Sequence, residues 1–74
     1  MVKIENHEIN NLEEAYDFLK EKYKSYPYDI WYEKRGIHSY IHIEDIYYSI
    51  HYQKKFTSVE EVKEFVESGG FDNN

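Results

Sequence analysis

The sequence predicts an α+β domain in the order β-α-β-β-β-α, in which an antiparallel sheet of three to four strands carries two helices packed on one face. In two segments, a capping residue is followed by apolar residues at helical spacing. Residues 28–52 alternate apolar and polar side chains, with a change of phase that indicates a turn. A chain of 74 residues makes one domain, 1–74, in which residues 72–74 are expected to form a disordered tail.

The first strand and first helix are predicted from short local patterns. Apolar and charged residues alternate over residues 2–4, so a strand is expected there, beside an edge strand of the sheet, followed by a turn over residues 5–8. The helix begins at Asn10 or Asn11, because Asn11 and Glu14 form a capping-box pattern, and it ends before Pro27. Its apolar stripe consists of Leu12, Ala15, Tyr16, Leu19 and Tyr23.

Residues 28–52 are expected to form three antiparallel strands joined by two-residue turns at Arg35-Gly36 and Glu44-Asp45. The aliphatic residues are odd-numbered before the second turn and even-numbered after it, as expected when a strand folds back and opposed residues share a face. Residue 30 then opposes residue 41, and residue 43 opposes residue 46. The predicted buried face consists of Tyr28, Ile30, Tyr32, Ile37, Ile41, Ile43, Ile46, Tyr48, Ile50 and Tyr52.

The second helix is predicted to begin at Ser58, because Glu61 completes a capping box with it. Gly69-Gly70 supplies a left-handed C-cap, and Phe71 is expected to fold back on the last turn. The apolar stripe of this helix consists of Val59, Val62 and Val66, flanked by Phe65.

The opposite face of the predicted sheet carries unusual side chains for a solvated surface. The expected register gives three cross-strand rows: Glu33, His38 and His51; Trp31, Tyr40 and Ser49; and Asp29, His42 and Tyr47. Aromatic rings at this density either stabilise the sheet locally or form a docking surface. The candidate binding residues on this face are Trp31, Tyr40, Tyr47, His38, His42 and His51.

Several classes of function are not expected. The chain has no cysteine, which excludes disulfides and thiolate chemistry, and it has no apolar run long enough to span a membrane, so a cytoplasmic protein is expected. His38, His51 and Glu33 would be close enough to share a metal ion, but the spacing of known zinc sites is missing, so no metal or cofactor is expected. Ser49 and His51 on an open sheet lack a sheltered pocket, so no enzymatic activity is expected.

The negative charge of the chain indicates what kind of partner to expect. The net charge is −6, and residues 57–74 carry five acidic residues against one lysine, so a basic protein partner is favoured over nucleic acid. The sequence thus predicts a small non-enzymatic inhibitor or adaptor that uses the aromatic face and an acidic surface. The acidic surface consists of Asp29, Glu33, Glu60, Glu61, Glu64 and Glu67.

Two alternatives use the same face: single-stranded nucleic acid stacking on its aromatic rings, or a homodimer that buries it. The helix-sheet-helix order resembles that of the double-stranded RNA-binding domain, but the second helix is acidic where that domain has a basic helix. In length, acidity and richness in Lys, Ile, Asn and Tyr, the chain resembles accessory proteins of phages and mobile elements, including nucleic-acid mimics and anti-defence inhibitors.

Overall fold

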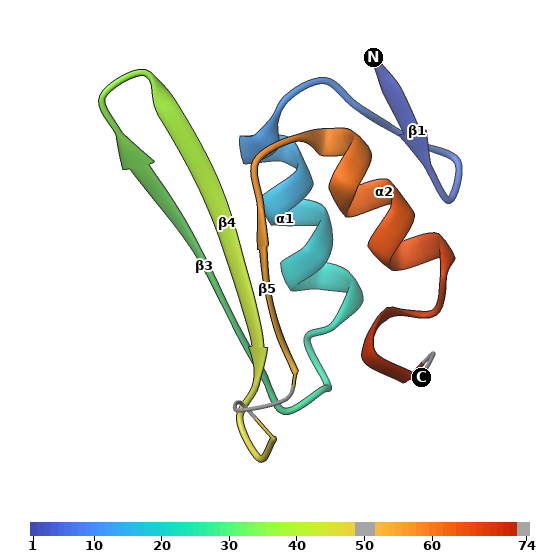
Figure 1. Cartoon of the computed structure of the whole chain (residues 1–74). Helices are drawn as coiled ribbons and strands as arrows, with labels where there is room; N and C mark the ends of the chain where they lie inside the picture. The colour runs from blue at the N-terminus through green and yellow to red at the C-terminus, as the bar shows by residue number, and fades with distance from the viewer. Residues whose placement is uncertain (49–51, 73–74) are drawn as a thin grey trace.

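The structure, a computed structural model, describes residues 1–48 and 52–72. The elements in chain order are β1 (Val2–Ile4), β2 (His7–Ile9), α1 (Leu12–Lys22), β3 (Tyr28–Arg35), β4 (His38–Asp45), β5 (Gln53–Phe56), α2 (Val59–Glu67) and the 3₁₀ helix η1 (Gly70–Asp72). Strands β3, β4 and β5 form an antiparallel sheet in that order, and β1 and β2 form a separate hairpin. Both helices lie on one side of the three-stranded sheet (Figure 1), which confirms the predicted α+β architecture.

Both helices begin as the sequence predicts. Asn11 is the N-cap of α1, where its Oδ1 accepts a hydrogen bond from the Glu14 backbone N–H at 2.9 Å; Glu14 Oε1 in return accepts from the Asn10 backbone N–H at 2.9 Å. Ser58 is the N-cap of α2, and its Oγ accepts from the Glu61 backbone N–H at 3.3 Å. Each cap lies within five consecutive residues, so the sequence alone identifies it.

The N-terminal segment differs from the prediction. The strand at Val2–Ile4 is confirmed, but it pairs with β2 and not with an edge of the main sheet. The turn is confined to Glu5 and Asn6, whose φ values of 48° and 70° fit the type I′ turn of a tight hairpin. Asn adopts positive φ readily and Glu rarely does, so the sequence signal for this hairpin is weak.

The first turn of the predicted sheet lies one residue later than expected. Gly36 and Ile37 form it, with Gly36 at a φ of 59°, so that Ile30 opposes Ile43 and not Ile41. Ile37, expected on the buried face, is 93% exposed. Because the register moved by two residues, an even number, the β3 and β4 side chains that were predicted within strands keep their predicted faces.

The predicted third strand is wrong in position. Ile46, Tyr47 and Tyr48 form bends after β4, and β5 begins only at Gln53. Ile41 therefore opposes Phe56, where the sequence predicted residue 48. Ile46 is 60% exposed, and Ser49, Ile50 and His51 lie outside the described residues.

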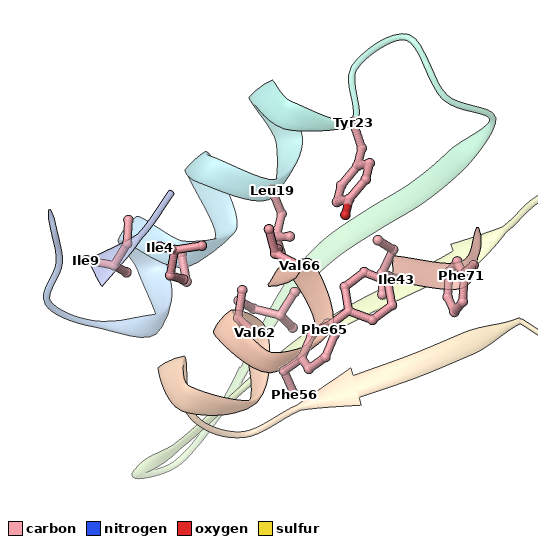
Figure 2. Close-up of a cluster of buried hydrophobic side chains, with 12 residues drawn as sticks. Ile4, Ile9, Leu19, Tyr23, Ile43, Phe56, Val62, Phe65, Val66 and Phe71 are labelled. Carbon is pink, nitrogen blue, oxygen red and sulfur yellow. The ribbon is translucent and has the colours of Figure 1, made fainter. Parts of the chain in front are cut away.

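The core lies between the sheet and the two helices. Side chains from α1, α2, β4 and β5 point to a common centre in Figure 2, among them Leu19, Val66 and Ile43. Phe71 packs on Phe65 with ring centroids 5.0 Å apart, as predicted for the residue after the C-cap. The predicted tail begins at Asp72, which ends η1, and Asn73 and Asn74 lie outside the described residues. The buried core residues are Ile4, Ile9, Ala15, Leu19, Tyr23, Ile41, Ile43, Phe56, Val62, Phe65, Val66 and Phe71.

Candidate functional site

The candidate site is the side of the β3-β4-β5 sheet that faces away from the helices, here called the open face. Alternation along the strands places every second side chain there, since Ile41 and Ile43 point into the core. The side chains on the open face are Asp29, Trp31, Glu33 and Arg35 of β3, His38, Tyr40, His42 and Glu44 of β4, and Gln53 and Lys55 of β5.

Trp31 stands at the middle of the open face. It opposes His42, and the two rings stack with centroids 4.8 Å apart and planes 9° from parallel. One face of the indole is thereby covered, yet Trp31 remains 40% exposed. A large ring that a stacked neighbour already holds in place offers contact area to a partner and loses little side-chain conformational entropy on binding.

Glu33 holds two neighbouring side chains, Arg35 and His42, in place beside Trp31. Its Oε2 accepts a hydrogen bond from Arg35 Nε at 2.7 Å, and its Oε1 lies 3.1 Å from His42 Nε2. The bond from Arg35, followed by the contact with His42, holds the pKa of the Glu33 carboxyl below its ordinary value. Glu33 therefore positions the His42 ring against Trp31, and Arg35 already neutralises part of the charge of Glu33.

Tyr40 is engaged by a cation of its own chain. The Lys55 ammonium lies 4.2 Å from the centre of the Tyr40 ring, within the range of a cation–π contact. The centroid of the His38 ring lies 6.4 Å from that of Tyr40. Tyr40 is half-buried, so it offers a partner less free surface than Trp31 does.

Two carboxylates oppose each other at one end of the open face. Asp29 is directly opposite Glu44, and Gln53 follows in the same row on β5. Within residues 1–48 and 52–72, neither carboxylate forms an ion pair with a lysine, arginine or histidine. Like charges directly opposed in a sheet destabilise it. An external cation placed between Asp29 and Glu44 would relieve that repulsion.

The structure separates the predicted binding residues. Trp31, Tyr40, His38 and His42 share the open face, but the predicted rows are wrong, because Trp31 opposes His42 and Tyr40 opposes Glu33. Tyr47 lies beyond the end of β4, where it is 76% exposed, so it is not part of the sheet. His51 lies outside the described residues.

The predicted acidic residues also fall into separate groups. Asp29 and Glu33 lie on the open face, whereas Glu60, Glu64 and Glu67 are exposed on α2, on the other side of the sheet. Glu61 also lies on α2, and its Oε1 accepts hydrogen bonds from Thr57 and Ser58, so it has a structural role at the helix start.

Sequence reasoning missed Glu44 as a member of the face. Glu44 was assigned to a tight turn, although Glu44-Asp45 lacks the Gly or Asn that such turns require. That missing turn signal could have kept Glu44 in the strand opposite Asp29.

The described residues hold no group of three His, Asp or Glu side chains arranged for a metal ion. The predicted trio of Glu33, His38 and His51 includes a residue outside them. Over the same ranges, no helix has the length and apolar character needed to cross a membrane.

Comparison of the chain with known protein families, with characterised proteins and with solved structures gave no match.

Proposed function

We propose that this protein is a non-enzymatic binding protein that engages a protein partner with a basic surface through its open face. The observation that carries the proposal is the arrangement at the centre and one end of that face. There, the partly exposed indole of Trp31, held in place by stacking on His42, lies beside the opposed carboxylates of Asp29 and Glu44.

A lysine or arginine of the partner fits this arrangement chemically. The cation would lie against the free side of the indole, which attracts positive charge through its ring quadrupole. Its charged end would reach the Asp29 and Glu44 carboxylates one row away and relieve their mutual repulsion. The net charge of −6 would further attract a basic surface at long range.

Single-stranded nucleic acid would use the same face less well. Of the cations on the described part of the open face, Arg35 is bonded to Glu33 and Lys55 lies over Tyr40. A phosphate backbone would have to compete for these cations and would meet Asp29 and Glu44 at one end. Since phosphate neutralisation supplies most of the affinity for nucleic acid, the open face favours a protein partner.

The finer proposal is that this binding serves an inhibitor or adaptor in the cytoplasm, of the kind encoded by phages and mobile elements. Its support is the chain's small size, acidity and composition. In that role the carboxylates would occupy a phosphate-binding groove of the partner, and Trp31 would be the buried anchor.

Affinity capture from the host that encodes the chain tests the proposal when it is done with matched variants. The wild-type protein should retain a basic protein in low salt and release it as salt is raised. Trp31→Ala should weaken binding by about 30-fold, as expected for an aromatic hot spot, and Glu44→Gln should weaken it and reduce its salt dependence. Ile37→Ala, which removes an exposed apolar side chain from the β3–β4 turn, should bind like the wild type.

A titration with defined probes separates the two classes of partner. Trp31 is the only tryptophan of the chain, so its fluorescence reports on the open face directly. An arginine-rich peptide should change that fluorescence at lower concentrations than a single-stranded oligonucleotide. Tighter binding of the oligonucleotide, or capture that survives Trp31→Ala unchanged, would contradict the proposal.

A further inference from the structure

The outer edge of β3 is a second surface of the molecule. Among the strands of residues 1–48 and 52–72, β3 pairs with β4 alone, so its other side has no neighbouring strand there, although the Tyr28 backbone N–H donates to the Tyr26 carbonyl. We propose that β3 pairs in antiparallel fashion with β3 of a second copy, with Tyr32 opposite Tyr32, to form a continuous six-stranded sheet.

The two edges of the sheet differ in how they are protected. β5 is four residues long and carries Lys54 and Lys55 in succession, so a second β5 laid against it would bring lysine against lysine. Short strands and lysines are the means by which proteins block edge pairing. β3 has eight residues, and its charges favour pairing in one register.

Charge selects the register. In a continuous sheet, opposed residues point to the same face. The allowed registers of two β3 strands therefore differ from one another by steps of two residues. With Tyr32 opposite Tyr32, Asp29 opposes the second copy's Arg35, and the symmetry gives this favourable pair twice. The next register in one direction places Asp29 opposite Glu33, and the next in the other direction places Glu33 opposite itself, so both bring like charges together.

The middle of the edge also supplies apolar contact. Tyr32 packs against Tyr16 of α1 with ring centroids 5.8 Å apart, and both side chains are partly exposed. In the proposed register the Tyr16–Tyr32 pairs of the two copies meet at the two-fold axis. There, aromatic contacts would add to the backbone hydrogen bonds.

The helices leave room for this contact. α1 packs over both β3 and β4. With strands about 4.8 Å apart, an α1 axis midway between β3 and β4 would put the two α1 helices of the dimer roughly 10 Å apart, at the upper end of the usual distance for packed helices. This dimer leaves Trp31 and the rest of the open face uncovered apart from Asp29 and Arg35, which it pairs, so it is distinct from a homodimer that buries that face.

Single-cysteine variants test the register, because the chain has no cysteine of its own. In the proposed dimer the residues at position 32 are directly opposed, whereas the residues at position 34 are about 13 Å apart. Tyr32→Cys should form a covalent dimer on mild oxidation, and Lys34→Cys should form little. Equal or faster cross-linking of Lys34→Cys would overturn the register.

A charge swap tests the same contact without altering Tyr32. Sedimentation equilibrium should show dimerisation of the wild type, weakened about tenfold in Asp29→Arg or Arg35→Asp and restored when both changes are combined. Circular dichroism checks that each variant is folded. A wild-type protein that stays monomeric up to about 1 mM, or a dimer that neither single change weakens, would overturn the proposal.

Discussion

At the scale of single residues, Glu61 links the end of the sheet to the start of α2. Its Oε1 accepts hydrogen bonds from Thr57 Oγ1 at 2.7 Å, from the Thr57 backbone N–H at 2.9 Å and from Ser58 Oγ at 3.2 Å. The bonds from the Thr57 side chain and then from its backbone lower the pKa of the Glu61 carboxyl. The sequence predicted Glu61 both as a cap partner and as part of the acidic surface, and its bonds favour the first role.

This pKa shift predicts how stability changes in acid. Because the pKa of Glu61 is lower in the folded chain than its ordinary value of 4.5, ionised Glu61 adds stability above pH 4.5. That stability is lost as the pH falls through the lowered folded value. In Glu61→Gln the amide oxygen still accepts a hydrogen bond but carries no charge. Urea unfolding from pH 7 to pH 2 should therefore show the wild type more stable at neutral pH, and the difference should shrink in acid.

Glu60→Gln is the matched control, since Glu60 lies on the same helical turn, is exposed and undergoes the same change of charge. Its difference from the wild type should vary less between pH 7 and pH 2 than that of Glu61→Gln. A difference for Glu61→Gln that stays constant over this range would mean that the bonds to Thr57 do not depend on the charge of Glu61.

At the scale of elements, the helices could be predicted from the sequence and the strand pairing could not. An N-cap and an apolar stripe are local features that both α1 and α2 follow, and Gly69 adds a local stop signal after α2. Alternation of side chains predicts a face, but it does not say which residues pair. The register errors are two residues at β3–β4 and eight at β4–β5; because the first is an even number, the predicted faces of β3 and β4 survived, whereas Ile46 and Tyr48 of the predicted third strand are exposed.

The residues directly after β4 misled the prediction because the Ile46 backbone is bonded to the segment before β3 and not to a returning third strand. The Ile46 backbone N–H donates to the Pro27 carbonyl at 2.8 Å, and the Tyr52 N–H donates to the Tyr48 carbonyl at 2.8 Å. The first of these bonds connects the end of β4 to the segment before β3, and the second is local, between residues four apart. No pattern within residues 46–52 records a contact with Pro27, so the sequence alone gave no reason to place a bend there.

A pair of isoleucines distinguishes the observed pairing from the predicted one. In the predicted register Ile43 and Ile46 are opposed and both buried, whereas in the structure Ile43 is 1% exposed and Ile46 is 60% exposed. Ile43→Ala should lower the free energy of unfolding by about 2–5 kcal/mol, as expected for a large-to-small change in a core. Ile46→Ala should lower it by less than about 0.5 kcal/mol. Urea unfolding measures both.

A small domain has little stability to lose, so Ile43→Ala risks leaving no folded protein to measure. Ile43→Val, with an expected loss of about 0.5–1.5 kcal/mol, keeps the comparison possible. Similar losses for Ile46→Val and Ile43→Val would favour the predicted register over the observed one.

At the scale of the whole molecule, part of the candidate site could be predicted. The sequence identified Trp31, Tyr40 and His42 as neighbours on an uncovered face, because alternation decides faces. It missed that Asp29 opposes Glu44, since that pairing depends on the register. The open face and the β3 edge lie side by side. Edge pairing of two copies would therefore join their open faces and place two Trp31 rings diagonally across the new contact, about 7–8 Å apart.

The two edges of the sheet should respond differently to protein concentration, which hydrogen exchange can measure. Beyond Tyr28, whose N–H is already bonded to the Tyr26 carbonyl, the outward amides of β3 would gain hydrogen bonds in the proposed dimer, so exchange over residues 29–35 should slow as the concentration rises. Amides of β5, residues 53–56, serve as an internal control and should not change, because Lys54 and Lys55 oppose pairing there. Arg35→Asp should abolish the concentration dependence in β3. Slower exchange in β5 alone, or equally in both strands, would show that self-association, if present, uses another surface.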